Sequence, residues 1–146
     1  MSIYNHILLA VDLSEASHQL VEKVRIIAQS CQSDLSLIHV IEPLSFAYGG
    51  DVPMDLTAIQ EQLDEHAQEK IRKFSAALDY PIKHQHIVSG HTESEIHRIA
   101  EETNCDLIVV GSHGRQGLAL LLGSTANGVL HGANCDVLAI RLTEEE

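Results

Sequence analysis

Two kinds of apolar pattern alternate along this chain, in the order βαβαβαβαβ. Short apolar runs rich in Val, Ile and Leu predict buried strands, and apolar residues recurring every three or four positions predict amphipathic helices. Strict alternation favours one parallel sheet with helices on both faces, joined by right-handed crossovers. We expect strands over 4–11, 35–41, 82–88, 105–110 and 136–140. We expect helices over 14–33, over 56–78, from Thr92 onward, and over 126–133. Ser14 should cap the first helix, and Ile96, Ile99 and Ala100 should face the core from the third.

The length and composition suit a single α/β domain spanning residues 1–146. Hydrophobic residues make up 45% of the chain but aromatic residues only 3%, so Ile, Val, Leu and Ala must fill the core. We expect a three-layer sandwich wound in the flavodoxin-like way or a related one, with strand order 3-2-1-4-5. In such sheets the connections diverge between strands 1 and 4, and ligands bind at the carboxyl ends of these strands.

A glycine-rich stretch follows the expected fourth strand. Gly111 and Gly114 come directly after the apolar run 105–110, and Gly123-Ser124-Thr125 precedes the last expected helix. Glycine lets backbone approach a ligand, and a helix N-terminus offers unpaired N–H groups to an anion. The arrangement suits a phosphate, and Asp12 at the end of the first strand should face the same crevice. The alternative is a structural loop whose glycines accommodate positive φ.

Charge and segment composition exclude several functional classes. The net charge is −12, which repels a nucleic-acid backbone but not a compact nucleotide held locally by N–H groups and a cation. No apolar run approaches the ~20 residues of a membrane span, so we expect a cytosolic protein without membrane attachment. The cysteines form no CxxC pair and sit in or beside apolar segments, so we expect small core residues without a disulfide.

The sequence resembles the universal stress proteins over essentially its whole length. Residues 4–15 and 35–40 look like the family's first two strands, and 111–114 followed by Gly123-Ser124 looks like the motif G-x2-G-x9-G-[S/T] of its ATP-binding branch. The resemblance implies the adenine nucleotide alpha hydrolase-like fold and ATP held with Mg²⁺ or Mn²⁺. The implied contacts with adenine and ribose are Ala10, Asp12, Val40, Val110, Gly111, His113 and Gly114, with Arg115 beside them, and those with phosphate are Gly123, Ser124 and Thr125.

One departure from the family motif keeps other functions open. Gly114 and Gly123 are separated by eight residues, 115 to 122, where the motif has nine, and the N-terminal half looks like the universal stress protein A branch, which lacks the glycines. We favour an ATP-binding regulatory module of the stress response, with its signalling partner unassigned. The alternatives are a nucleotide-free dimeric interaction module and a slow ATP hydrolase, for which Asp12 is the only candidate base.

The sequence contains few residues arranged for other kinds of catalysis or for metal binding. No Lys follows the glycines as in a Walker loop, and no G-x-S-x-G elbow occurs, so we assign no catalytic residue. His84 and His86 share one face of a strand, but a zinc site needs about four converging ligands. We therefore assign no metal ligand and interpret these histidines as solvent-facing.

Two expectations concern the ends of elements. Thr92 and Glu95 have the spacing of a capping box, in which each side chain bonds the other's backbone N–H. The strand 136–140 should form a sheet edge with an apolar surface, and such an edge tends to pair with another chain. We expect a homodimer through this strand, as the resemblance also implies.

Overall fold

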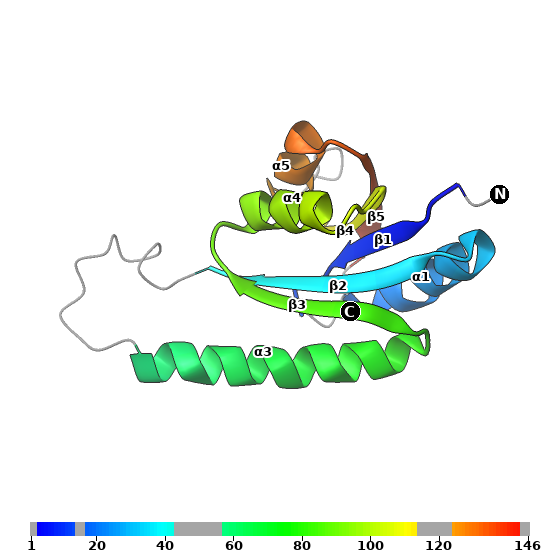
Figure 1. The fold of residues 1–146 in the computed structure, drawn as a ribbon. Helices are drawn as coiled ribbons and strands as arrows, with labels where there is room; N and C mark the ends of the chain where they lie inside the picture. Colours follow the sequence, from blue (N-terminus) through cyan, green and yellow to red (C-terminus); the bar gives the residue numbers. More distant parts are fainter. Residues whose placement is uncertain (1–2, 14–16, 43–56, 114–123, 144–146) are drawn as a thin grey trace.

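The computed structural model describes residues 3–13, 17–42, 57–113 and 124–143. The described strands form one parallel sheet in the order β3-β2-β1-β4-β5, which confirms the predicted fold and strand order (Figure 1). The elements in chain order are β1 (His6–Ala10), α1 (His18–Cys31), β2 (Asp34–Ile41), α3 (Thr57–Leu78), β3 (Ile82–Ser89), α4 (Thr92–Glu102), β4 (Leu107–His113), α5 (Ser124–Gly132) and β5 (Asp136–Leu142).

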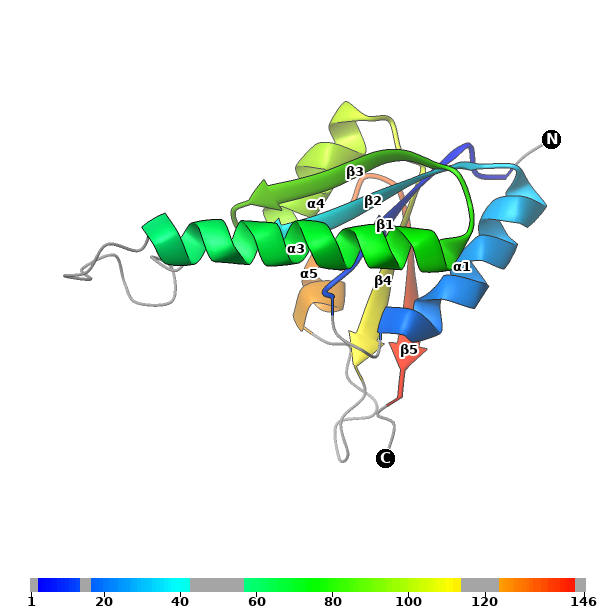
Figure 2. The ribbon, with the colours of Figure 1, turned by 90° about the horizontal axis from the view of Figure 1, so that it is seen from below.

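Helices cover both faces of the sheet. Figure 2 shows α1 and α3 in front of the strands, with α4 and α5 on the far side. Because side chains alternate along a strand, each strand contributes to both apolar layers. The layer under α1 and α3 contains Ile7, Leu9, Val24, Leu35, Leu37, Ile71, Phe74, Val109 and Leu142, and the layer under α4 and α5 contains Leu8, Ile38, Ile96, Ile99, Ala100, Ile108, Val110, Ala126 and Val129.

The strands on the β5 side run further than the sequence predicts. We expected ends at Val110 and Ile140, but β4 continues to His113 and β5 to Leu142. Each extension supports the other, because residues 111–113 pair in register with residues 140–142. The backbone N–H and C=O groups of the two segments thereby gain hydrogen-bond partners. Gly111 is therefore a strand residue and not the first residue of a loop.

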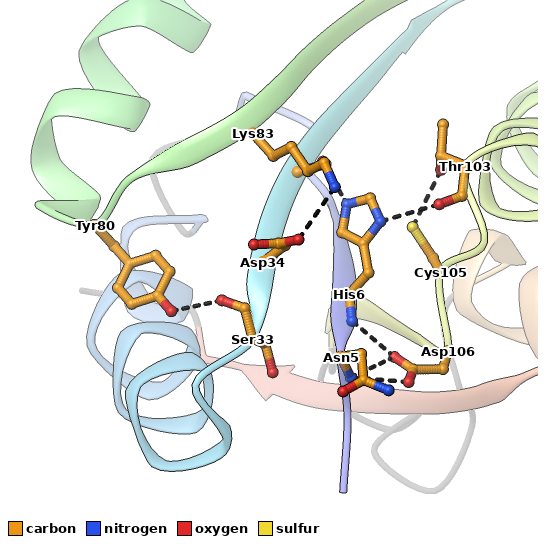
Figure 3. Close-up of polar contacts among 10 residues, drawn as sticks. Asn5, His6, Ser33, Asp34, Tyr80, Lys83, Thr103, Cys105 and Asp106 are labelled. Atoms are coloured by element: carbon orange, nitrogen blue, oxygen red, sulfur yellow. Dashed lines mark hydrogen bonds and ion pairs between the residues drawn. The ribbon is translucent and has the colours of Figure 1, made fainter. Parts of the chain in front are cut away.

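Polar side chains form hydrogen bonds at the amino-terminal ends of the strands (Figure 3). The predicted ligand site lies at the opposite, carboxyl-terminal ends. The Asp106 carboxylate accepts hydrogen bonds from the backbone N–H groups of Asn5 and His6, the shortest at 2.8 Å. The His6 ring donates from Nδ1 to the Thr103 carbonyl at 3.1 Å, so its Nε2 accepts from the Ser36 hydroxyl at 2.7 Å. These bonds fix β1 against β2 and the end of α4.

The expected core role of the cysteines holds for Cys105 but only in part for the other two. Cys105 is buried, Cys31 and Cys135 are half-buried, and all three are free thiols. Burial raises the pKa of the Cys105 and Cys135 thiols, which keeps them protonated and weakly nucleophilic. None of the described helices is long and apolar enough to cross a membrane.

Candidate functional site

The sheet brings the ends of β1 and β4 together as predicted. These two strands are parallel neighbours in the middle of the sheet, with Leu9 opposite Val109. Chain connections leave the pair in opposite directions, since β1 leads to β2 on one side and β4 leads to β5 on the other. This is the topological position at which open α/β sheets bind ligands.

The turn after β1 is held in a defined conformation. The Val11 N–H donates to the Ile38 carbonyl at 2.9 Å, and the His39 ring donates from Nδ1 to the Val11 carbonyl at 2.7 Å. Leu13 then adopts a left-handed backbone with φ of 64°, which costs a non-glycine residue about 1 kcal/mol or more. A conformation of that cost persists only where neighbouring contacts impose it, and such positions cluster at functional sites.

Asp12 is fixed within this turn. Its side chain is exposed, and its Oδ1 accepts a hydrogen bond of 2.5 Å from the buried Ser17 hydroxyl. Ser17 is also the residue at the N-cap of α1, where it makes no capping bond. The expected helix start and cap at Ser14 lie outside the described residues, but α1 itself begins at His18, later than predicted.

Three predicted apolar site residues meet on one face of the sheet. Ala10, Val40 and Val110 all belong to the layer under α4 and α5. Val110 is buried, whereas Ala10 and Val40 are half-buried and so keep part of their surface accessible. The structure therefore places a partly accessible apolar surface at the ends of these strands, with Ala10 two residues before Asp12 in the chain.

Gly111 points to the opposite face. A Cβ built on its backbone would lie 2.7 Å from Leu142 Cδ1, closer than carbon atoms approach. Leu142 belongs to the layer under α1 and α3, so packing alone accounts for a glycine at this position. A role for Gly111 in ligand binding would have to come from its backbone.

The predicted phosphate residues lie at the start of α5. This helix begins at Ser124, with Thr125 in its first turn, two residues earlier than the predicted start at Ala126. Because α5 connects two parallel strands, it runs against them and begins at their carboxyl edge. Gly114, Arg115 and Gly123 lie outside the described residues, and for His113 the structure gives only its strand position.

The close packing of α5 on α4 was not predicted. Gly128 and Gly132 face the side chains of Glu93 and His97, and a Cβ at either glycine would collide with them. The His97 ring donates from Nε2 to the Val129 carbonyl at 2.8 Å, in the last turn of α5. The four-residue glycine spacing was the sequence signal for this contact.

The start of α4 corrects the predicted capping box. His91 and not Thr92 is the N-cap residue, and the Glu95 N–H donates to the His91 carbonyl at 3.0 Å. The Thr92 hydroxyl instead donates to Glu42 Oε1 at 2.9 Å, beyond the end of β2. The box fails because Thr92 is the first helical residue and not the N-cap residue, whose side chain would accept from the N3 backbone N–H.

The two predicted solvent-facing histidines differ from each other. His84 is exposed, but His86 is half-buried, and their ring centroids are 5.7 Å apart. Burial lowers the pKa of the His86 imidazole, and the neighbouring His84, His6 and Arg98 act in the same direction. His86 is therefore a neutral imidazole at neutral pH and not part of an ordinary solvated surface.

Comparison with known proteins agrees with the fold. The model of the universal stress protein family matches residues 3–141. Universal stress protein A homolog 1 of Coxiella burnetii is 39% identical over 142 residues, which cover 97% of this chain and 99% of that protein. Among solved structures, hypothetical protein MJ0577 superposes with a TM-score of 0.77 at 26% identity, covering 98% of this chain and 99% of that one.

A further solved structure of the same fold is a universal stress protein in complex with cAMP. It is 23% identical, has a TM-score of 0.64, and covers 96% of this chain and 98% of its own. The match to the family model and the similarity to the Coxiella protein both extend over nearly the whole chain. This chain belongs to the universal stress protein family.

Proposed function

We propose that this protein is a cytosolic regulatory module of the stress response that binds ATP with Mg²⁺ or Mn²⁺ at the carboxyl ends of β1 and β4. The observation that carries the proposal is the constrained turn after β1. In this turn the His39 ring donates a hydrogen bond to the Val11 carbonyl, and Leu13 has a positive φ. Asp12 accepts a hydrogen bond from Ser17. Three other described non-glycine residues with positive φ, Gln32, Asp79 and Asn104, follow helices, whereas Leu13 follows a strand at the carboxyl end of the sheet, where ligands bind in this kind of fold.

The residues around this turn suit the parts of an adenine nucleotide. Ala10, Val40 and Val110 offer an apolar surface to a flat base, and the Asp12 carboxylate can accept hydrogen bonds from ribose hydroxyls. The N-terminus of α5, with Ser124 and Thr125, offers backbone N–H groups to phosphates. A bound divalent cation would offset phosphate charge in a protein whose net charge is −12.

The fold supports this choice of ligand class. A universal stress protein of the same fold has been solved with cAMP, so the architecture is able to hold an adenine nucleotide. Hydrolysis is less well supported, because one oxygen of Asp12, the candidate base, already accepts a hydrogen bond from the Ser17 hydroxyl. We therefore favour binding that changes the surface offered to a signalling partner, without turnover.

The β5 edge favours a homodimer as the working unit. β5 is the last strand of the sheet on its side, and Leu138 keeps 36% of its surface exposed there. An edge strand with an exposed apolar side chain tends to pair with another chain, and a two-fold axis would bring the same strand from both subunits together.

Calorimetry with ATP and with adenosine tests the proposed site. Asp12→Ala should weaken both ligands, whereas Ser124→Ala should weaken ATP much more than adenosine. Loss of a hydrogen bond to a charged group costs about 1.5–3 kcal/mol, about tenfold or more in Kd. Glu61→Ala, an exposed substitution on α3, is the matched control and should change neither Kd.

Two results would contradict the proposal. If millimolar ATP with Mg²⁺ gives no heat and no thermal shift, the protein is the nucleotide-free module. If Asp12→Ala and Ser124→Ala weaken both ligands equally, the nucleotide is not oriented with its base at β1 and its phosphates at α5.

A further inference from the structure

The free edge of β3 carries a pair of imidazoles on one face. β3 is the outermost strand on the side of the sheet away from β5, so β2 pairs with only one of its edges. The register slips by one residue, since Leu35 lies opposite Ile82 but Leu37 lies opposite Gln85. Such an irregularity re-aims side chains, and it lies directly before His86 and includes His84.

The two rings are close to the separation that a shared metal ion requires. A zinc–nitrogen bond is about 2.1 Å long, so two imidazoles at a tetrahedral angle have centroids about 5 Å apart. The centroids of His84 and His86 are 5.7 Å apart, with the ring planes inclined by 48°. His84 is exposed, so rotation of its side chain can close the difference.

His86 has an unused nitrogen. Its Nε2 is shielded from solvent and has no hydrogen-bond partner among the described residues. A buried polar atom without a partner is costly, and a metal ion would satisfy it. The neutral state of His86 also suits coordination, because metal ligands must be deprotonated.

The charges around the pair act in both directions: Arg98 and His6 disfavour positive charge at His86, whereas Glu102 favours it. Arg98 pairs with Glu95 at 2.9 Å and with Glu102 at 3.1 Å. Lys83 pairs with Asp34 at 3.1 Å, as Figure 3 shows. These carboxylates offset part of the positive charge of Arg98 and Lys83. The protein as a whole carries a net charge of −12, which attracts cations.

We propose that His84 and His86 form a two-imidazole chelate for a divalent transition-metal ion of the zinc and copper class on the free edge of β3. No three His, Cys, Asp or Glu side chains of the described residues converge as a metal site, so solvent completes the coordination. Imidazole ligands select Zn²⁺ and Cu²⁺ and disfavour Mg²⁺. This site lies on a different part of the sheet from the proposed nucleotide site and does not depend on it.

Titration with Zn²⁺ and with Cu²⁺, on the full chain without nucleotide, tests the chelate. The unmodified protein should bind one equivalent at this edge, and His84→Ala and His86→Ala should each weaken it at least about tenfold, because one imidazole loses the chelate advantage. His66→Ala, an exposed histidine of α3, is the matched control and should leave the affinity of this site unchanged. Mg²⁺ should not compete.

Paramagnetic broadening by Cu²⁺ locates the ion independently of the affinity. Amide signals of β3 should broaden first, and those of α3 around His66 only at higher Cu²⁺ concentration. If His86→Ala does not fold, the exposed His84→Ala decides the question by itself. Affinity equal to the unmodified protein in His84→Ala, equal losses in His66→Ala, or first broadening away from β3 would overturn the proposal.

Discussion

Substituting Gly111 tests whether this glycine serves packing or ligand binding. A Cβ at this position would lie 2.7 Å from Cδ1 and 3.2 Å from Cγ of Leu142, whereas carbon atoms in contact are about 3.5–4.0 Å apart. Leu142 has only 2% of its surface exposed, so it must change rotamer within a packed layer. Overpacking of this kind costs about 1–3 kcal/mol, which we expect for Gly111→Ala.

A second substitution makes the cause testable. Leu142→Ala should cost about 2–5 kcal/mol, because it leaves a cavity in the layer under α1 and α3. In the Leu142→Ala background the new methyl group at position 111 enters that cavity, so Gly111→Ala should cost close to nothing. The double variant should then be more stable than the sum of the single effects by about 1–3 kcal/mol.

Urea unfolding followed by far-ultraviolet circular dichroism measures the cycle, since the chain contains no Trp for fluorescence. ATP binding by the same four proteins separates the two roles. If packing alone requires glycine, the double variant should bind ATP as Leu142→Ala does. Stability effects that add within about 0.5 kcal/mol would refute the packing argument, and loss of binding in both Gly111→Ala proteins would assign the glycine to the ligand.

Two further predictions concern the edges of the sheet. Burial lowers the pKa of His86; His84, His6 and Arg98 act in the same direction, and Glu102 opposes them. As the pH falls, this imidazole is therefore protonated in the unfolded chain before it is protonated in the folded protein. The free energy of unfolding should decline below about pH 6.5, and it should decline less in His86→Gln. Urea unfolding with a chelator present measures this, and equal pH dependence of the free energy of unfolding in the two proteins would contradict it. At β5, Leu138→Lys should convert a dimer to a folded monomer, as measured by light scattering. Ile26→Lys, at an exposed apolar residue of α1, is the control and should leave the dimer intact. A monomer mass for the unmodified protein above micromolar concentration would contradict the dimer proposal.

The strand order was predictable because it depends on features that are local in the sequence. Apolar periodicity identifies each element, and alternation of strands and helices leaves few ways to wind a parallel sheet. The inward residues of α4, Ile96, Ile99 and Ala100, are buried as expected. The prediction that Asp12 and the end of β4 lie at one edge follows from the same topology.

The errors arose where long-range contacts determine the outcome. β4 extends to His113 because β5 lies beside it, a pairing that the local pattern around Gly111 does not encode. The capping box at Thr92 competed with Glu42, which is distant in the sequence but adjacent in space. The fixing of the β1 turn by His39 and Ser17 likewise depends on contacts between separate elements.

The position of β4 also bears on the predicted glycine motif, whose spacer is one residue shorter than the resemblance to the ATP-binding branch implies. Gly111 is held in register opposite Ile140, and Ser124 already belongs to α5, so both flanking elements are fixed by the sheet and its helices. The missing residue falls between Gly114 and Gly123, after the end of β4 and before the start of α5. The shortening therefore changes the connection and not the two elements it joins. We expect ATP to bind despite this change, and the Ser124→Ala and Asp12→Ala variants test the phosphate side and the adenosine side of the proposed site separately.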